Sequence, residues 1–167
     1  YPLVNNWVKQ LRNYLQKQWP ALIFREPSFR YISTIDVDST FRFKEKGALW
    51  SISGGFRDLL KWKPGRVLNR IKTLWGLKPD DFDIFDEYEA FHKEYGIEVI
   101  YFFLLGDYGQ YDKNISHLNP KQAEIIKKLA ITNRMGIHPS YGSNHKAGML
   151  EQEIERFTEI TMIKPQI

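Results

Sequence analysis

The segment that decides the fold is YISTIDVD, residues 31–38. It is rich in β-branched and aromatic residues, which predicts a buried β-strand over residues 31–37. Two aspartates mark its carboxyl end, with Asp36 inside the strand and Asp38 just beyond it. Side chains two positions apart on a strand project to the same side, so we expect both carboxylates to point the same way.

Two neighbouring carboxylates repel each other when both are ionised, so something must hold Asp36 and Asp38 together. A bound divalent cation or a shared proton would do this and would make the pair functional. The alternative is a turn at the end of the strand, in which Asp38 caps the next segment. The spacing of the two residues leaves both interpretations open.

Helical and strand patterns alternate after this strand. Apolar spacing and turn residues predict helices over residues 56–62, 67–75, 83–95, 120–132 and 146–161, and strands over 97–105 and 135–138. The pairs Gly54-Gly55 and Pro64-Gly65 are expected to break the chain around the first two helices. This order is typical of an α/β protein with a parallel sheet or barrel.

Two parts of the chain are distinguished by composition. Residues 1–30 are expected to form a helix over 4–18 and a linker, and residues 31–167 an α/β domain with a basic helical insertion over 41–78. No apolar run approaches the roughly 20 residues of a membrane span, so none is expected. Residues 1–10 show no signal-peptide pattern, which gives a cytoplasmic location as the expectation.

The insertion carries the basic character of the chain. The net charge is +4, but residues 41–78 hold ten Lys or Arg against two acidic residues. Aromatic residues lie between these cations, which suits nucleic acid, a membrane surface or an anionic glycan. The cations do not form one dense stripe, so we favour a solvated hairpin whose tryptophans pack on the domain. Nucleic acid is therefore not expected as a partner, and contact with an anionic surface stays open.

Candidate site residues follow the later strands, because ligands of such folds lie beyond the carboxyl ends of the strands. The loop 106–114 is polar, aromatic and rich in glycine. Its Asp107 and Tyr108 suit a sugar, since aromatic faces stack on pyranose rings and carboxylates accept hydroxyl protons. The alternative is a tight surface loop.

Histidine supplies the other candidates. The chain has no cysteine, which excludes disulfides and thiolate catalysis and leaves His, Asp and Glu to bind any metal. His138 ends the third predicted strand and could bind a metal together with Asp38, or form only local hydrogen bonds. His145 is the nearby candidate for a further ligand in a zinc site. His92, inside the acidic helix 83–95, is expected at the surface.

Three motifs resemble those of polysaccharide deacetylases, the NodB-homology or carbohydrate esterase family four group. They are TIDVD at residues 34–38, YFFLLG at 101–106 and MGIHPSYGS at 135–143, in the order of the family. The resemblance implies a partial or distorted (β/α) barrel that hydrolyses C–N bonds and removes acetyl groups from N-acetylated sugars. It implies Asp36 as general base, and Asp38 and His138 as ligands of a divalent metal, expected to be zinc. Asp107, Tyr108, Tyr141 and Ser143 would then contact the carbohydrate.

The sequence also departs from the family pattern. A second histidine is usual four residues after the first, where this chain has Gly142, so Ser143, His145 or water would have to replace that ligand. Pro139 stands where the family has Ser or Thr. The later motifs of the family have no match before Ile167, so we expect a divergent and truncated domain. The alternative function is a catalytically inactive barrel that binds glycan or a protein partner.

Overall fold

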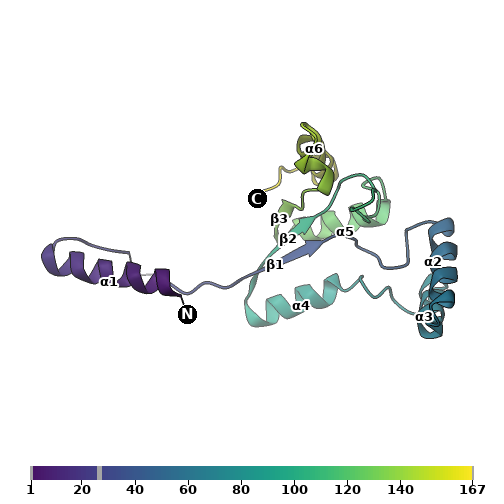
Figure 1. Ribbon diagram of the computed structural model, residues 1–167, viewed down its shortest axis with the longest axis horizontal. Coiled ribbons are helices and arrows are strands. Elements are labelled where there is room, and N and C mark those ends of the chain that lie inside the picture. The colour runs from purple at the N-terminus through teal and green to yellow at the C-terminus, as the bar shows by residue number, and fades with distance from the viewer. Residues whose placement is uncertain (1, 26–27, 167) are drawn as a thin grey trace. The chain divides into compact units, whose positions relative to one another are not determined.

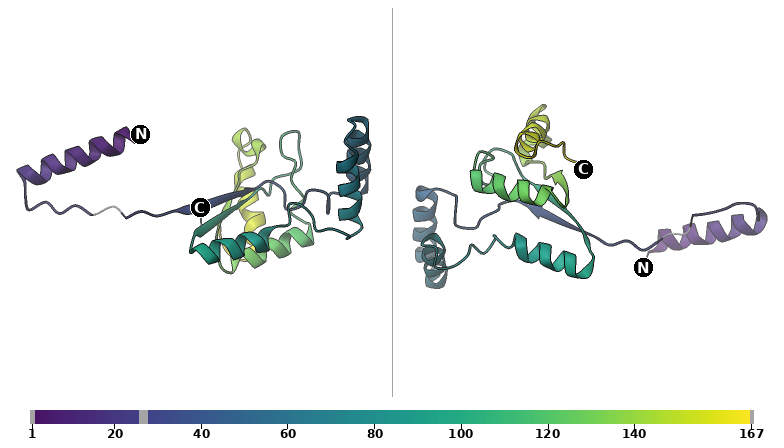
Figure 2. Two further views of the ribbon diagram at one scale, coloured as in Figure 1. Left: turned by 90° about the horizontal axis from the view of Figure 1, so that it is seen from below. Right: turned by 180° about the vertical axis from the view of Figure 1, so that it is seen from behind.

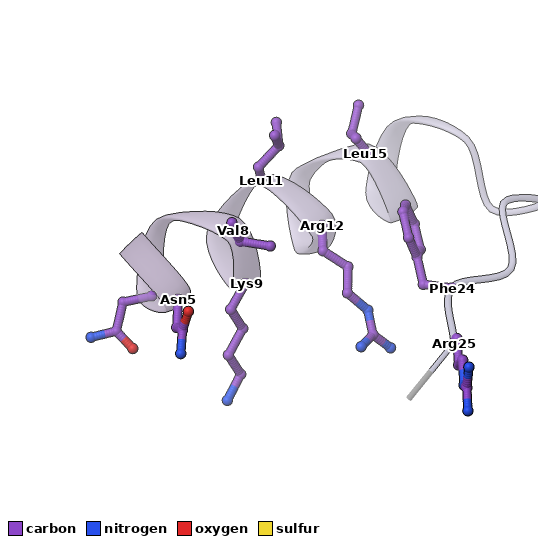
Figure 3. A pocket seen from close by; sticks show the side chains of 9 residues that line it. Asn5, Val8, Lys9, Leu11, Arg12, Leu15, Phe24 and Arg25 are labelled. Carbon is purple, nitrogen blue, oxygen red and sulfur yellow. The ribbon is translucent and has the colours of Figure 1, made fainter. Parts of the chain in front are cut away.

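The computed structural model describes residues 2–25 and 28–166, except the side chains of Ala48 and Leu49. The chain divides into two compact units, residues 1–30 and 31–167. In the first unit, helix α1 (Leu3–Gln18) is followed by a segment that folds back, with the Arg12 guanidinium 5.6 Å from the centre of the Phe24 ring. A hollow of about 740 Å³ lies between α1 and this segment, and Figure 3 shows the side chains that line it.

The second unit is built on a three-stranded parallel sheet (Figures 1 and 2). Its strands are β1 (Ile32–Val37), β2 (Glu98–Phe103) and β3 (Arg134–Ile137), in the order β1-β2-β3. The other elements are α2 (Ala48–Leu60), α3 (Pro64–Leu74), α4 (Phe85–Tyr95), α5 (Pro120–Ala130), the 3₁₀ turn η1 (Tyr141–Asn144) and α6 (Met149–Thr161). The prediction of an α/β fold with parallel strands is confirmed, and the sheet is open.

One face of the sheet forms the core. Val37, Phe103 and Ile137 are aligned across the three strands and are all buried. Phe85 of α4, Ile126 and Leu129 of α5, and Phe157 of α6 belong to the same apolar cluster. On the opposite side of β1, Thr34 and Asp36 are exposed. The three helices that pack on the sheet thus contribute to a cluster on one face.

The acidic helix α4 differs from expectation at His92. This side chain is buried, and its Nδ1 atom lies 2.6 Å from the carbonyl oxygen of Tyr88, one turn earlier. The expectation of a surface histidine was therefore wrong. Its ring also meets that of Phe91 edge-on, which gives it an aromatic contact as well as a polar one.

The glycine pair Gly54-Gly55 lies inside α2 and does not border it, so the predicted break was wrong. Glycine at position 54 has a packing role instead, because the Arg70 side chain of α3 approaches α2 at this point. A Cβ atom on Gly54 would lie 2.7 Å from a terminal nitrogen of Arg70, whereas one on Gly55 would be 3.8 Å from the Arg70 Cδ. Pro64 does not break α3 but begins it, in the first turn where the missing N–H costs nothing.

Asp80 closes the base of the insertion. Its buried carboxylate accepts backbone N–H groups from Arg42, Phe43 and Lys44 before the helices and from Phe82 after them, at 2.6–3.1 Å. Hydrogen bonds from several N–H groups suit an ionised carboxylate out of water. The two ends of the insertion are therefore held together at one side chain, which we call the Asp80 clamp.

The tryptophans of the insertion do not pack on the domain as expected. Trp62 is 91% exposed and Trp75 is 77% exposed, while Trp50 is half-buried beneath the Arg70 guanidinium. No helix among the described residues is long and apolar enough to cross a membrane.

Candidate functional site

Asp38 and His138 meet at the carboxyl end of the sheet. The backbone ladder continues past the strands, because Leu104 N–H donates to the Val37 carbonyl and His138 N–H to that of Phe103. This places the residues after β1 and β3 on either side of Leu104. The Nε2 atom of His138 lies 3.6 Å from the Oδ1 atom of Asp38. Two residues far apart in sequence are thus brought together as the spacing predicts for the ends of parallel strands.

A hollow of about 690 Å³ lies beside this pair. Its polar lining includes Asp38, His138, Asp112 and Tyr141, together with Lys46 from the base of the insertion. The Asp38 side chain is 77% exposed and that of His138 is 35% exposed, so both are accessible to a ligand from water. The hollow therefore offers carboxylate, imidazole, phenol and ammonium groups to one bound molecule.

Asp36 is placed differently from Asp38. It lies within β1, is exposed, and lines a second hollow with Phe82 and Tyr88. Asp38 lines both hollows, but Asp36 does not line the one that contains His138. The structure therefore brings Asp38 to the histidine and keeps Asp36 beside it, in the adjacent hollow.

Asp107, the first carboxylate of the loop after β2, makes a structural contact. Asp107 forms an ion pair with Arg156 of α6 at 2.9 Å, and Arg156 also donates to the Leu105 carbonyl. Tyr108 is exposed and lies beneath the Lys113 ammonium group, 4.7 Å from the ring centre. Neither residue lines the hollow beside His138.

Arg156 also acts on a neighbouring histidine. Burial lowers the pKa of His117 below its ordinary value, and the positive charge of Arg156 lowers it further, against the opposing charges of Asp107 and Glu159. His117 thus favours its neutral form in the folded protein.

The turn after His138 is held in place by hydrogen bonds. The buried Ser140 donates its N–H to Glu153, and its hydroxyl accepts the N–H of Ser143. The Ser143 hydroxyl donates to the Ser140 carbonyl, so this side chain stabilises the turn. A Cβ on Gly106 would lie 2.5 Å from the Ser140 Cβ, so only glycine allows the chain beyond β2 to approach this turn so closely.

Tyr141 belongs to the hollow. Its N–H donates to both carboxylate oxygens of Asp112, at 3.0 and 3.1 Å, and its ring lies 4.1 Å from that of Tyr111. Both rings line the hollow. Two adjacent aromatic faces beside polar groups suit the binding of a sugar ring.

The replacement ligands expected for the missing histidine do not join the pair. His145 packs edge-on against Tyr141, 5.3 Å between ring centres, and does not line the hollow. In residues 2–25 and 28–166, no group of three His, Asp or Glu side chains is placed to hold a metal. A Cβ on Gly142 would lie 3.0 Å from the Met149 methyl group, so a side chain there would have to displace Met149.

The separation of Asp38 and His138 fits two ligands of one zinc ion. With metal–ligand distances of about 2.0–2.2 Å and tetrahedral angles, two ligand atoms lie about 3.4 Å apart. The observed 3.6 Å is close to this value. A zinc site with these two protein ligands would need further ligands from water or substrate, since catalytic sites commonly have three protein ligands.

Lys46 gives the hollow an unusual cation. Burial lowers the pKa of its ammonium group, and the charge of Arg70 adds to this, while Asp80 opposes it. The ammonium nitrogen lies 4.9 Å from the centre of the Trp50 ring, which stabilises the charged form without adding a counterion.

Asp112 and Lys46 were not singled out from the sequence as site residues. Asp112 lies in the loop 106–114, and the place of this loop after the second strand is the sequence signal that could have identified it. Lys46 had no such signal, because it reaches the hollow only through the folding of the insertion.

No family model, curated protein sequence or solved structure matches the chain.

Proposed function

We propose that the domain formed by residues 31–167 is a metal-dependent hydrolase of the polysaccharide deacetylase type, which removes acetyl groups from N-acetylated sugars. The observation that carries this proposal is the approach of the Asp38 carboxylate to the His138 imidazole, 3.6 Å apart at the carboxyl end of a parallel sheet. Both residues occupy the positions of metal ligands in the motifs that the chain resembles.

The arrangement of helices supports a relationship to barrels. Side chains of α4, α5 and α6 join one apolar cluster on a single face of the sheet. In a (β/α) barrel the helices lie outside the strands, whereas a doubly wound sheet has helices on both faces. We therefore propose that the three strands are part of a distorted (β/α) barrel, with Thr34 and Asp36 on its inner side.

Asp38 and His138 would hold the divalent ion, with zinc as the expected metal. Bound zinc would polarise the amide carbonyl and lower the pKa of a water molecule. Asp36 would be the general base by resemblance; it lies two residues before Asp38, with which it lines the adjacent hollow. Tyr141 and Tyr111 would stack on the sugar, and Lys46 would bind its hydroxyl or carbonyl oxygens.

The test combines metal binding with product release. The purified 167-residue chain is treated with chelator and titrated with zinc by calorimetry, and acetate release is then measured with an N-acetylglucosamine oligomer. Zinc affinity is expected to fall at least about tenfold in Asp38→Ala and in His138→Ala. His117→Ala serves as the control, because His117 does not line the hollow. Zinc binding that is absent, or that is equal in all variants, would refute the metal site.

A second function is favoured by the short ligand set. No third His, Asp or Glu joins Asp38 and His138 in the described part of the chain. The tyrosine pair remains suited to a glycan without any metal. Under this alternative, the oligomer binds the chain without releasing acetate, and Tyr141→Ala weakens binding while His138→Ala does not.

A further inference from the structure

The helical hairpin α2–α3 has its polar contacts inside and apolar side chains outside. Arg70 of α3 and Asp58 of α2 are both buried and form an ion pair at 3.2 Å. The Arg70 guanidinium also lies over the rings of Phe43 and Trp50, at 4.6 and 5.0 Å from their centres. Gly54 gives this guanidinium the space it needs. The face that joins α2 to α3 is therefore largely polar.

Four apolar side chains of α2 are exposed and take no part in this contact. Ile52, Phe56, Leu59 and Leu60 recur at helical spacing and are 59–70% exposed. The turn and α3 add further exposed apolar residues. These are Trp62, Leu68, Ile71, Leu74, Trp75 and Leu77. Together with the four residues of α2 they form what we call the hairpin apolar surface. Exposed large apolar side chains in this number on one helical hairpin mark an interaction site.

The exposed charges on the hairpin itself, over residues 48–77, have one sign. The sequence between residues 48 and 77 contains a single acidic residue, Asp58, and that carboxylate is buried against Arg70. Five cations are exposed. They are Arg57, Lys61, Lys63, Arg66 and Lys72. The hairpin therefore combines exposed aliphatic and aromatic groups with a positive charge that no exposed acidic side chain of residues 48–77 offsets.

These features favour an anionic lipid bilayer over other partners. Aliphatic groups such as Ile52 and Leu59 offer no face for a nucleic-acid base to stack on. A second copy of the chain would bring an equal set of cations against the first, and like charges repel. In a bilayer, by contrast, leucines enter the acyl region, tryptophans lie at the headgroup level and cations contact anionic headgroups.

We propose that the hairpin apolar surface binds the surface of membranes that contain anionic lipids, and that it lies in the interface without spanning it. Phe56, Leu60 and Trp62 enter the bilayer, and Lys61 and Lys63 at the turn bind lipid phosphates. Lys46 and Phe82, at the base of the insertion, also line the hollow beside His138. The proposal stands on the hairpin alone and does not depend on the deacetylase function.

The experiment is flotation of the 167-residue chain with vesicles. Vesicles of phosphatidylcholine containing 30% phosphatidylglycerol are compared with vesicles of phosphatidylcholine alone, at about 0.1 M and 0.5 M salt. The chain is expected to float with the anionic vesicles, at least about tenfold more strongly than with neutral ones, and less at high salt. Phe56→Ala/Trp62→Ala is expected to lower the affinity at least about tenfold, since both side chains lose buried apolar area.

Matched controls separate the hairpin from other surfaces. Leu118→Ala/Ile131→Ala removes two exposed apolar residues outside the insertion and should bind as the parent chain does. Lys61→Glu/Lys63→Glu reverses the charge at the turn without touching the buried pair, so it tests the proposal even if the aromatic variant fails to fold. Circular dichroism and thermal unfolding report on folding.

Three results would overturn the proposal. One is equal binding of the parent chain and both hairpin variants, which would assign vesicle binding to another segment. Another is an absence of binding to either kind of vesicle. The last is a parent chain that elutes as a dimer and becomes monomeric in Phe56→Ala/Trp62→Ala, because the hairpin apolar surface would then be covered by a second copy.

Discussion

The Nε2 atom of His138 lies 3.6 Å from the Oδ1 atom of Asp38, although the two residues follow the two outer strands of the sheet. The strand between them sets this distance through its register, in which Val37 pairs with Phe103 and Phe103 with Ile137. A shift of one residue in either pairing would turn one of the two side chains to the opposite face. The candidate metal site therefore depends on the register of all three strands.

We predict that a histidine at position 142, where the sequence motif lacks its further ligand, strengthens metal binding. An imidazole there needs the space that the Met149 methyl group fills, since a Cβ would already lie 3.0 Å from it. Gly142→His/Met149→Ala is therefore expected to bind zinc at least about tenfold more tightly than the parent chain. Gly142→His alone should gain less, and Met149→Ala alone nothing. Calorimetric titration measures all four proteins, and equal affinities would contradict the prediction.

The two glycines of α2 should respond to alanine with opposite signs. Gly55→Ala meets only an ordinary contact and is expected to stabilise the protein by up to about 1 kcal/mol, the usual helix preference of alanine. Gly54→Ala must displace the buried Arg70 from Asp58, so we expect a loss of about 1–3 kcal/mol in the free energy of unfolding. Urea denaturation of the two variants checks this, and a stabilised Gly54→Ala would show that Arg70 moves freely.

Asp80 should be far more sensitive than its neighbour Asp83. Asp80→Asn replaces one acceptor oxygen by an NH₂ group that faces backbone donors, with an expected cost of about 2–4 kcal/mol. Asp83 is an exposed residue, but the partial desolvation of its carboxyl group and the nearby negative charge of Asp80 raise its pKa. Asp83→Asn is therefore expected to be neutral or slightly stabilising. Equal losses in the two variants, measured by thermal unfolding, would refute the Asp80 clamp.

His117 should make stability depend on pH. Its pKa is lowered in the folded protein, by burial and by Arg156, so the unfolded chain takes up the proton first as pH falls. Its contribution is complete above about pH 6.5 and decreases below that value, until the folded protein is protonated too. As the pH is lowered from about 6.5 to about 5, the melting temperature of the parent chain is therefore expected to fall relative to that of His117→Gln. A constant difference would contradict the assignment.

The sequence allowed the sheet and the pairing of Asp38 with His138 to be predicted. Their signals are local, because apolar strands and the residues that end them can be read one segment at a time. The α2 helix was mispredicted because Gly54 is explained only by Arg70, which comes from another helix. Lys46 was missed as a lining residue for the same kind of reason, since the folding of the insertion carries it to the hollow.

The insertion also shows where sequence patterns mislead about packing. Its tryptophans suggested contacts with the domain, yet Trp62 and Trp75 are exposed. The buried contact is instead the ion pair of Asp58 and Arg70. Burial by itself raises the pKa of Asp58, but the hydrogen bond from Arg70 and the charges of Arg66, Arg70 and Arg57 outweigh it, so that pKa lies below its ordinary value. Charge patterns in the sequence do not reveal which cation is buried.

The Asp80 clamp has a consequence for how this domain can vary. Because the segment before the helices and the segment after them are tied to one carboxylate, the strands do not depend on the length of chain between Lys44 and Asp80. That stretch is an interchangeable module: a shorter loop or a different pair of helices could replace it while the register of β1 with β2 is kept. Such a domain can change the surface to which it is recruited without rebuilding the groups at the ends of its strands.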